Sequence, residues 1–295
     1  MRRGTAQALV GGVCYGVTIV IGRTLAERGL GAPTVLGTRF TLSAVLMFVV
    51  LAISGRPLLP AKGERIGVFL LGACVYMVES TFFFMALERG SASAVALIYY
   101  CYPAVVTVLE IPFGLATWNR RTLVALALAL AGVGLVVGSG ADLHITTVGL
   151  LCISASILAF SCYMIASAKL MPRSDPRTSA AWVAMGAGTS FYLWGSLSGQ
   201  LKPVGEDLPL LLGTAGATAL AFTLMFLAIG HIGAARTSVL MTVEAFSAVV
   251  LGALVLHEKV GFWHAAGGLL ILSAAAVIAL APHPEQTVAQ IEAQP

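Results

Sequence analysis

The chain has 295 residues, of which 58% are hydrophobic and 10% are charged, with a formal net charge of +4 at pH 7. Soluble domains carry about 25% charged residues, so a chain this poor in charge cannot cover a water-facing surface. The cations lie in short loops between apolar runs, as in membrane proteins, and do not indicate nucleic-acid binding. We therefore expect an all-α polytopic membrane protein with the lipid bilayer as its solvent.

Ten apolar runs are long enough to cross a bilayer, which requires about 20 mainly apolar residues. Polar or proline-containing breaks such as 54–57 and 172–176 separate them. The polar tail at 283–295 is predicted to be disordered and cytoplasmic, and no run between the spans is long enough for a soluble domain. The expected spans are 5–22, 33–53, 66–87, 92–114, 121–140, 147–168, 178–198, 208–229, 234–256 and 261–281.

The distribution of Lys and Arg predicts how the chain is oriented. If both termini lie on one side, that side holds 11 of the 17 Lys and Arg residues and the other side holds 5, with Arg39 inside a span. Because cytoplasmic loops carry the excess of Lys and Arg, both termini are expected in the cytoplasm. A bacterial inner (plasma) membrane is the expected location.

The two halves of the chain, 1–142 and 143–282, resemble each other. A shift of 142 residues places the third to fifth spans on the eighth to tenth without a gap, and it matches the tight junctions 88–92 and 230–234. Since five spans per half is an odd number, the second half must enter the membrane from the opposite side. This predicts two inverted-topology five-helix repeats around a central cavity, as in many secondary transporters. The alternative is two similar bundles without functional symmetry.

Two charges inside apolar spans mark a candidate site. A charged side chain at the bilayer centre costs roughly 2.5–3.5 kcal/mol even on the lenient insertion scale, so it usually faces a partner or a wet cavity. Arg39 lies about 9 Å, and Glu79 about 12 Å, from the expected outer ends of their spans. We expect an Arg39–Glu79 ion pair in or beside the outer half of the cavity. The alternative is a structural pair that only locks two spans together.

Helical spacing groups further candidates on common faces. Tyr76 and Glu79 share a face of the third span, Tyr99 and Tyr102 share one on the fourth, and Met241 and Glu244 share one on the ninth. Under the repeat, Met241 matches Tyr99 and Glu244 matches Tyr102. Because a buried carboxyl can carry a proton or bind an amine, Glu79 and Glu244 are candidates for substrate binding or coupling. The candidate aromatic cavity residues are Tyr76, Tyr99, Tyr102, Tyr163 and Trp182, with ordinary helix packing as the alternative.

Two more positions in the fourth span carry expectations. Pro103 lies mid-span and removes one helical hydrogen bond, so a kink and a candidate hinge are expected there. Its counterpart Ala245 is not expected to kink the ninth span. Glu110 lies one turn from the cytoplasmic boundary, where its side chain is expected to snorkel or to form a loop salt bridge.

Two segments resemble the EamA branch of the drug/metabolite transporter (DMT) superfamily, in which each half carries an S/A-x-A junction, a Glu-Pro or X-Pro step and a Gly-Glu-x loop. Tyr102 and Ala245 depart from the Glu and Pro of that step, so the resemblance carries over no fixed ion site. The run 98–103 also resembles the YddG-type amino-acid exporters. The matching residues are Ala86, Leu87, Ser91–Ala94, Leu97, Pro103 and Glu110, then Ala228, Ile229, Ala234, Ala235, Leu240, Glu244, Leu254 and His257–Lys259.

The resemblance implies a secondary exporter that moves small amphipathic metabolites, most of all amino acids including aromatic ones, by alternating access, with protons as a candidate coupling ion. Multidrug or organic-cation efflux by the same fold is the alternative. An intramembrane enzyme is disfavoured because no H-E-x-x-H helix, mid-span His or Asp-rich pair occurs. No G-x-x-x-x-G-K-[ST] motif or Cys/His cluster indicates a nucleotide, metal or other cofactor.

Overall fold

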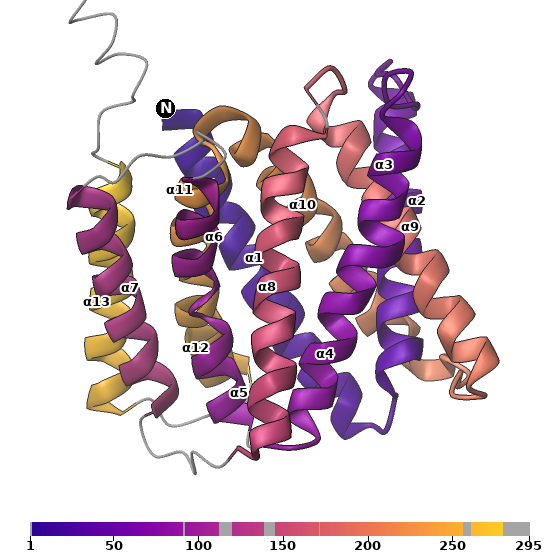
Figure 1. The fold of residues 1–295 in the computed structure, drawn as a ribbon. Coiled ribbons are helices and arrows are strands. Elements are labelled where there is room, and N and C mark those ends of the chain that lie inside the picture. The colour runs from indigo at the N-terminus through magenta and orange to yellow at the C-terminus, as the bar shows by residue number, and fades with distance from the viewer. Residues whose placement is uncertain are drawn as a thin grey trace, which may run out of the picture.

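The computed structural model describes residues 2–90, 92–111, 120–138, 145–170, 172–255 and 261–279; the predicted tail at 283–295 lies outside them. Apart from one isolated bridge between Gly90 and Ile145, the secondary structure of these ranges is helical. The elements (Figure 1) are α1 (Arg2–Glu27), α2 (Ala32–Ile53), α3 (Arg65–Leu70), the π-helix η1 (Leu71–Tyr76), α4 (Met77–Leu87), α5 (Ala92–Tyr99), α6 (Tyr102–Glu110), α7 (Arg120–Gly138), α8 (Thr147–Lys169), α9 (Pro176–Leu197), the 3-10 helix η2 (Gly205–Asp207), α10 (Leu208–Ile232), α11 (Ala234–Met241), α12 (Val243–Val255) and α13 (Phe262–Ala279).

Six helical segments in this part of the chain are long and apolar enough to cross a membrane. Large apolar side chains also point outward, among them Ile53 (82% exposed) and Leu197 (81% exposed). A helix satisfies its own backbone hydrogen bonds, which is what hydrocarbon requires of a spanning segment. The chain is therefore a multi-pass membrane protein. The six segments are Arg2–Glu27, Ala32–Ile53, Arg65–Leu87, Thr147–Lys169, Gly205–Ile232 and Ala234–Leu254.

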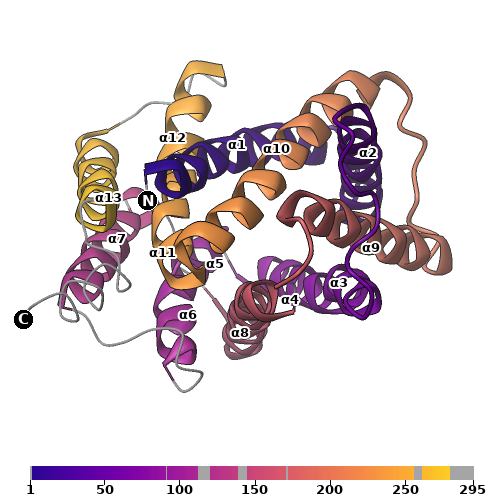
Figure 2. The same ribbon diagram turned by 90° about the horizontal axis from the view of Figure 1, so that it is seen from above.

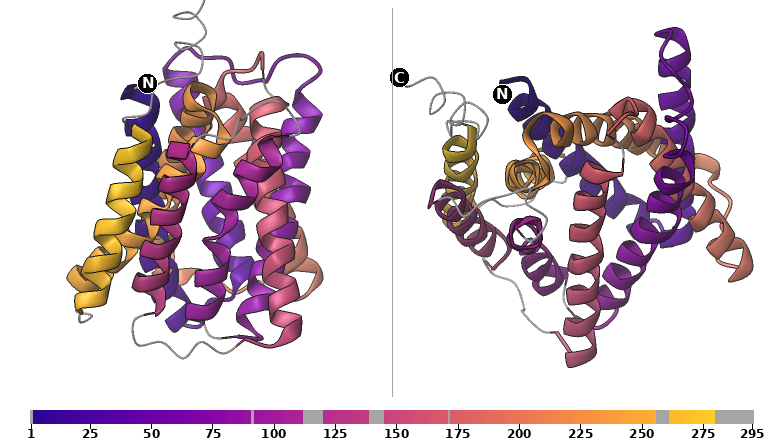
Figure 3. Two further views of the ribbon diagram at one scale, coloured as in Figure 1. Left: turned by 60° about the vertical axis from the view of Figure 1, so that its left-hand side comes forward. Right: turned by 45° about the horizontal axis from the view of Figure 1, so that its top comes forward.

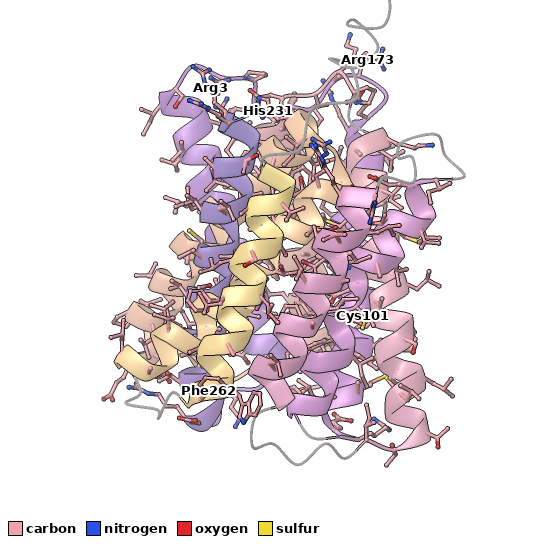
Figure 4. All side chains as sticks on the ribbon, turned by 90° about the vertical axis from the view of Figure 1, so that its left-hand side faces the viewer. Arg3, Cys101, Arg173, His231 and Phe262 are labelled. Carbon is pink, nitrogen blue, oxygen red and sulfur yellow. The ribbon has the colours of Figure 1, made fainter. Side chains whose placement is uncertain are left out.

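The bundle has two faces, which the helix ends define. Arg3, Arg173 and His231 lie at the end where α1 begins, called here the N-terminal face, and Phe262 lies at the opposite face (Figure 4). Helices then alternate in direction, so α2 ends and α9 begins at the N-terminal face.

Two of the helical segments are interrupted near the middle of the bundle. The first breaks at Tyr100 and Cys101, so that α6 begins at Tyr102 with Pro103 in its first turn, where the missing N–H of proline costs nothing. The second breaks at Thr242, where the Ala245 N–H donates to the Thr242 carbonyl three residues back. The expectation that the segment around Ala245 stays straight is therefore wrong, because a tightened turn interrupts it without a proline.

Neighbouring helices come mostly from different halves of the chain. α1 packs along α10, and α4 packs along α8 (Figures 1 and 2). α2 packs along α9, and α6 packs against α11. α7 and α13 form a pair at one edge of the bundle (Figure 3). The halves are thus interleaved rather than stacked as two separate bodies.

Polar contacts clamp the loops of the two halves together at both faces. At the N-terminal face Glu64, which is 7% exposed, accepts hydrogen bonds from Ser174 and from the Arg173 backbone N–H (3.2 Å). An Arg56–Asp175 ion pair of 2.8 Å lies beside them. At the opposite face, Arg28 pairs with Asp207 at 2.8 Å and Lys202 Nζ donates to the Gly29 carbonyl at 2.7 Å.

Glycines allow the closest helix approach, between α3–η1 and α9. A Cβ added at Gly72 would overlap the Val183 carbonyl, and one added at Gly186 would overlap the Phe69 carbonyl. Since a backbone carbonyl cannot rotate away as a side chain can, the two helices would have to separate.

We predict that Gly72→Ala lowers the free energy of unfolding by about 2 kcal/mol, because overpacked cores lose roughly this much. Thermal melting of the detergent-solubilised protein measures the loss. Gly67→Ala is the matched control, since a Cβ there meets nothing within 4 Å. Equal melting temperatures for the two variants would contradict the close approach.

The clamp at Glu64 predicts a pH dependence. Burial alone would raise the pKa of Glu64, but hydrogen bonds from Ser174 and Arg173 outweigh it and lower the pKa below its usual value of 4.5. A carboxylate with a lowered pKa stabilises the fold above its unfolded-state pKa, and this contribution disappears as the pH falls through the folded-state value. Glu64→Gln should therefore lose less thermal stability than the parent when the pH falls from about 7 to about 3.5.

Glu88→Gln serves as the control for this pH series, because the Glu88 side chain is 71% exposed. Parallel melting curves for Glu64→Gln and the parent across the whole pH range would refute the role of Glu64.

Candidate substrate cavity

A cavity of about 440 Å³ lies inside the bundle. Its deep end is formed at the two helix interruptions, where Tyr102 and Glu244 line it. Its other lining residues include Ala26 and Leu87 at helix ends of the opposite face, and Leu30 in the loop between α1 and α2. The cavity therefore runs from mid-bundle to the opposite face. Within the described ranges, no group of three or more His, Cys, Asp or Glu side chains is placed to hold a metal ion.

Glu79 is held on the cavity wall by three hydroxyl donors. It is 5% exposed, and its carboxylate accepts hydrogen bonds from Ser80 (2.9 Å), Tyr99 (2.9 Å) and Ser156 (3.3 Å). The π-helix η1 ends directly before α4, and its widened turn frees the Ala73 carbonyl to accept from Ser190 at 2.7 Å. The Glu79 carboxylate is thus fixed by α4, α5 and α8 together.

Arg39 does not form the predicted ion pair with Glu79. In the part of the chain that the structure describes, no Arg39–Glu79 contact falls within 4 Å, because the Glu79 oxygens are taken up by hydroxyls. The Arg39 guanidinium carbon lies instead 4.6 Å from the ring centroid of Phe40. Its Nε is buried and has no hydrogen-bond partner. Arg39 nevertheless lines the same cavity as Glu79, so its positive charge borders the cavity.

Glu244 provides a second carboxylate at the deep end of the cavity. It lies in the first turn of α12, directly after the interruption, and Met241 lines the cavity beside it. No described residue donates a hydrogen bond to the Glu244 side chain, whereas Glu79 receives three. Among the residues that the structure describes, the cavity is thus lined by one arginine, one fully engaged carboxylate and one carboxylate open to a ligand.

Aromatic rings form a large part of the remaining wall. The Tyr99 ring lies edge-on to Phe83 at 5.0 Å between centroids, and the Tyr102 ring lies edge-on to Phe160 at 4.9 Å. Tyr76 also lines the cavity. Edge-to-face packing leaves ring faces available to an aromatic or amphipathic solute, while the Tyr99 and Tyr102 hydroxyls donate to protein acceptors.

Two predicted cavity residues lie elsewhere. Tyr163 is fully buried behind the wall, edge-on to Tyr76 at 5.5 Å, and does not line the cavity. Trp182 lies at the N-terminal face, where its indole N–H donates to the Leu58 carbonyl at 2.9 Å as part of the loop clamp. Both positions are explained by packing between the halves, which spacing within one helix does not reveal.

Several cavity residues were missed from the sequence. Tyr15 and Gly22 line the cavity from α1, and they lie seven residues apart with Thr18 and Ile19 between them on the same wall. Phe160 lines it from α8, one turn after Ser156. Their spacing places them on one face of each helix. Because these spans are apolar on every side, the hydrophobic pattern does not distinguish that face from the others.

Glu110 also departs from expectation. It is 3% exposed rather than snorkelling, and its carboxylate accepts a hydrogen bond of 3.1 Å from the Ala235 backbone N–H in the first turn of α11. The reason is that the residue between α10 and α11 is Gly233, which has no side chain to cap α11, so the carboxylate of α6 satisfies the free helix donor.

Comparisons with known proteins agree with this architecture. A crystal structure superposes on the chain with a TM-score of 0.76 at 16% identity, covering 98% of this chain and 99% of the other. The uncharacterized transporter YwfM of Bacillus subtilis (strain 168) is 26% identical over 223 residues, 75% of each chain.

The family profile and the relative place this all-helical membrane bundle in the class of membrane transporters of small molecules, which are not enzymes. The sequence profile of the EamA-like transporter family matches residues 2–138 and, separately, residues 147–280. The chain belongs to the EamA-like transporter family, within the drug/metabolite transporter superfamily.

We predict that Gly22→Leu blocks solute entry without destabilising the fold. Gly22 lines the cavity, and a Cβ added there would meet no atom within 4 Å. Replacing a helical glycine also removes a backbone-entropy cost. Transport should fall by about ten-fold or more while the melting temperature holds or rises. Gly22→Ala is the control that retains most transport; equal transport by both variants would show that solute does not pass Gly22.

Proposed function

We propose that the chain is a secondary exporter that moves amino acids, including aromatic ones, by alternating access through this cavity. The observation that carries the proposal is that one aromatic cavity presents charges of both signs, with Arg39 on α2 and Glu244 on α12. An amino acid carries a carboxylate and an ammonium group, and each could meet its opposite charge while an aromatic side chain packs on Tyr76, Tyr99 or Tyr102.

The packing pattern supports the proposed ten spans in two inverted repeats, 1–142 and 143–282. The two family matches make α1 the counterpart of α8, and α4 the counterpart of α10. The α1–α10 contact then corresponds to the α8–α4 contact, while α2–α9 and α7–α13 each join a helix to its own counterpart. Such a pattern is expected of a two-fold axis in the membrane plane, with a site between the halves.

The same proposal places the protein in a bacterial inner membrane with both termini in the cytoplasm. The excess of Lys and Arg on that side supports it. Glu244 and Glu79 are the proposed carboxylates for amine binding or proton coupling, and Pro103 is a proposed hinge at the start of α6. Organic-cation efflux remains the second candidate, because Glu244 faces a cavity rich in aromatic rings, which bind cations.

The test is flux of labelled phenylalanine and of phenethylamine, which lacks the carboxylate, in proteoliposomes with and without a pH gradient. Arg39→Gln should lower phenylalanine flux about ten-fold, because a hydrogen bond to a charged group contributes roughly 1.5–3 kcal/mol. Glu244→Gln should lower the flux of both compounds. Glu88→Gln, on the surface, should change neither.

Two results would contradict the proposal. Flux of phenethylamine that equals or exceeds that of phenylalanine, and that persists in Arg39→Gln, would favour organic-cation efflux. Flux that is equal with and without the pH gradient would exclude obligate proton coupling.

A further inference from the structure

The contacts between the halves are of two kinds, which differ in symmetry. The clamp at the N-terminal face joins the α2–α3 loop to the α8–α9 loop, through Glu64 and Arg56. Its counterpart under the proposed repeat joins the α9–α10 loop to the α1–α2 loop, and the Arg28–Asp207 pair is formed there too. Contacts that exist at both faces at once cannot distinguish a state open to one face from a state open to the other.

The contact between the interrupted helices exists at one face only. α6 packs against α11 toward the N-terminal face. The counterpart of this pair is α12 with α5, toward the opposite face, and in the described ranges these two helices make no comparable contact. The cavity lies between them instead, since Ala96 and Tyr99 of α5 and Glu244 of α12 line it. Closure of the α6–α11 pair therefore accompanies opening toward the opposite face.

Two polar contacts hold the α6–α11 pair together. The Tyr102 hydroxyl donates to the Ser238 carbonyl at 3.3 Å, at the deep end of the cavity. Two helical turns closer to the N-terminal face, the Glu110 carboxylate accepts from Ala235 N–H at 3.1 Å. Between them Val106 is fully buried on the same face of α6. A carboxylate at a helix N-terminus is also favoured by the helix dipole.

We propose that Glu110 is the residue that holds the N-terminal-side gate of this transporter closed, by capping α11 from the other half of the chain. The inference rests on the proposed alternating-access cycle but not on the identity of the substrate. When the gate opens, α6 and α11 separate, the cap breaks, and water that enters the gap takes over the Ala235 N–H.

Under the proposed repeat, the counterpart of Glu110 cannot form the same cap at the opposite face. The position that corresponds to Glu110 under the shift of 142 residues is Gly252, which has no side chain to cap α5. The carboxylate therefore favours closure at the N-terminal face over closure at the opposite face. This bias accounts for a cavity that opens toward the opposite face.

The experiment measures labelling rates of single cysteines by a water-soluble maleimide in lipid nanodiscs, where both faces are accessible and no substrate is needed. Val106→Cys reports opening of the gate, and Gly22→Cys reports the mouth of the cavity. Both are placed in a background in which alanine or serine replaces the native cysteines, which are Cys14, Cys74, Cys101, Cys152 and Cys162.

Glu110→Ala should raise the labelling rate of Val106→Cys about ten-fold and lower that of Gly22→Cys, because it removes a charge-assisted hydrogen bond from the closed state alone. Glu110→Gln, whose amide oxygen still accepts a hydrogen bond, should give a smaller change in the same directions. Glu64→Gln is the matched control: it weakens the clamp at the same face and should lower thermal stability while leaving both labelling rates unchanged.

Unchanged rates at both cysteines in Glu110→Ala and Glu110→Gln would overturn the proposal. So would faster labelling at both cysteines, because loosened packing exposes both positions and a shifted gate moves them in opposite directions. A shift in labelling without phenylalanine flux would leave the gate standing and reject only the amino-acid substrate.

Discussion

The absence of water in the hydrocarbon core is the constraint on which the structure depends. A polar group in a spanning helix is costly unless it finds a partner inside the protein, because lipid supplies none. Ser161 and Ser167 return their hydroxyls to carbonyls four residues back, at 2.8 and 2.7 Å. Glu79 collects three hydroxyls, and Glu110 takes a helix N-terminus. Arg39 and Glu244 both border the cavity, where a solute can bind them. In the described ranges several buried hydroxyls have no hydrogen-bond partner, namely those of Tyr163, Ser179, Thr214 and Thr218.

The same constraint explains why the interrupted helices meet at the centre of the bundle. A break in a helix frees backbone donors and acceptors, which is tolerated at membrane depth only where protein or a wet cavity covers them. The break at Tyr100 and Cys101 and the break at Thr242 both lie beside the cavity. The freed groups are covered from across the bundle: Ser238, in the second interrupted segment, accepts from Tyr102 in the first. Irregular backbone and solute passage therefore occupy the same place.

What could be predicted from the sequence is what depends on one helix at a time. Span positions follow from apolar length, and the shared faces of Tyr76 with Glu79 and of Met241 with Glu244 follow from the helical period. The predictions that were wrong concern contacts between side chains of different helices. Arg39 was expected to pair with Glu79, but the Tyr99 and Ser156 hydroxyls donate to that carboxylate instead. Trp182 was expected in the cavity, but it binds the loop of the other half.

Departures from the proposed internal repeat make the two open states of the transporter unequal. Two identical repeats would make the two open states equal in free energy, and a difference of about 1.4 kcal/mol is enough to change their ratio ten-fold. The counterpart positions are unequal at two places along one helix face: Tyr102 corresponds to Glu244, and Glu110 corresponds to Gly252. The first pair places a carboxylate beside only one of the two helix interruptions, and the second caps only one gate. A ligand that binds Glu244 then acts on an equilibrium that Glu110 has already biased, because a ligand shifts two states only by its difference in affinity for them.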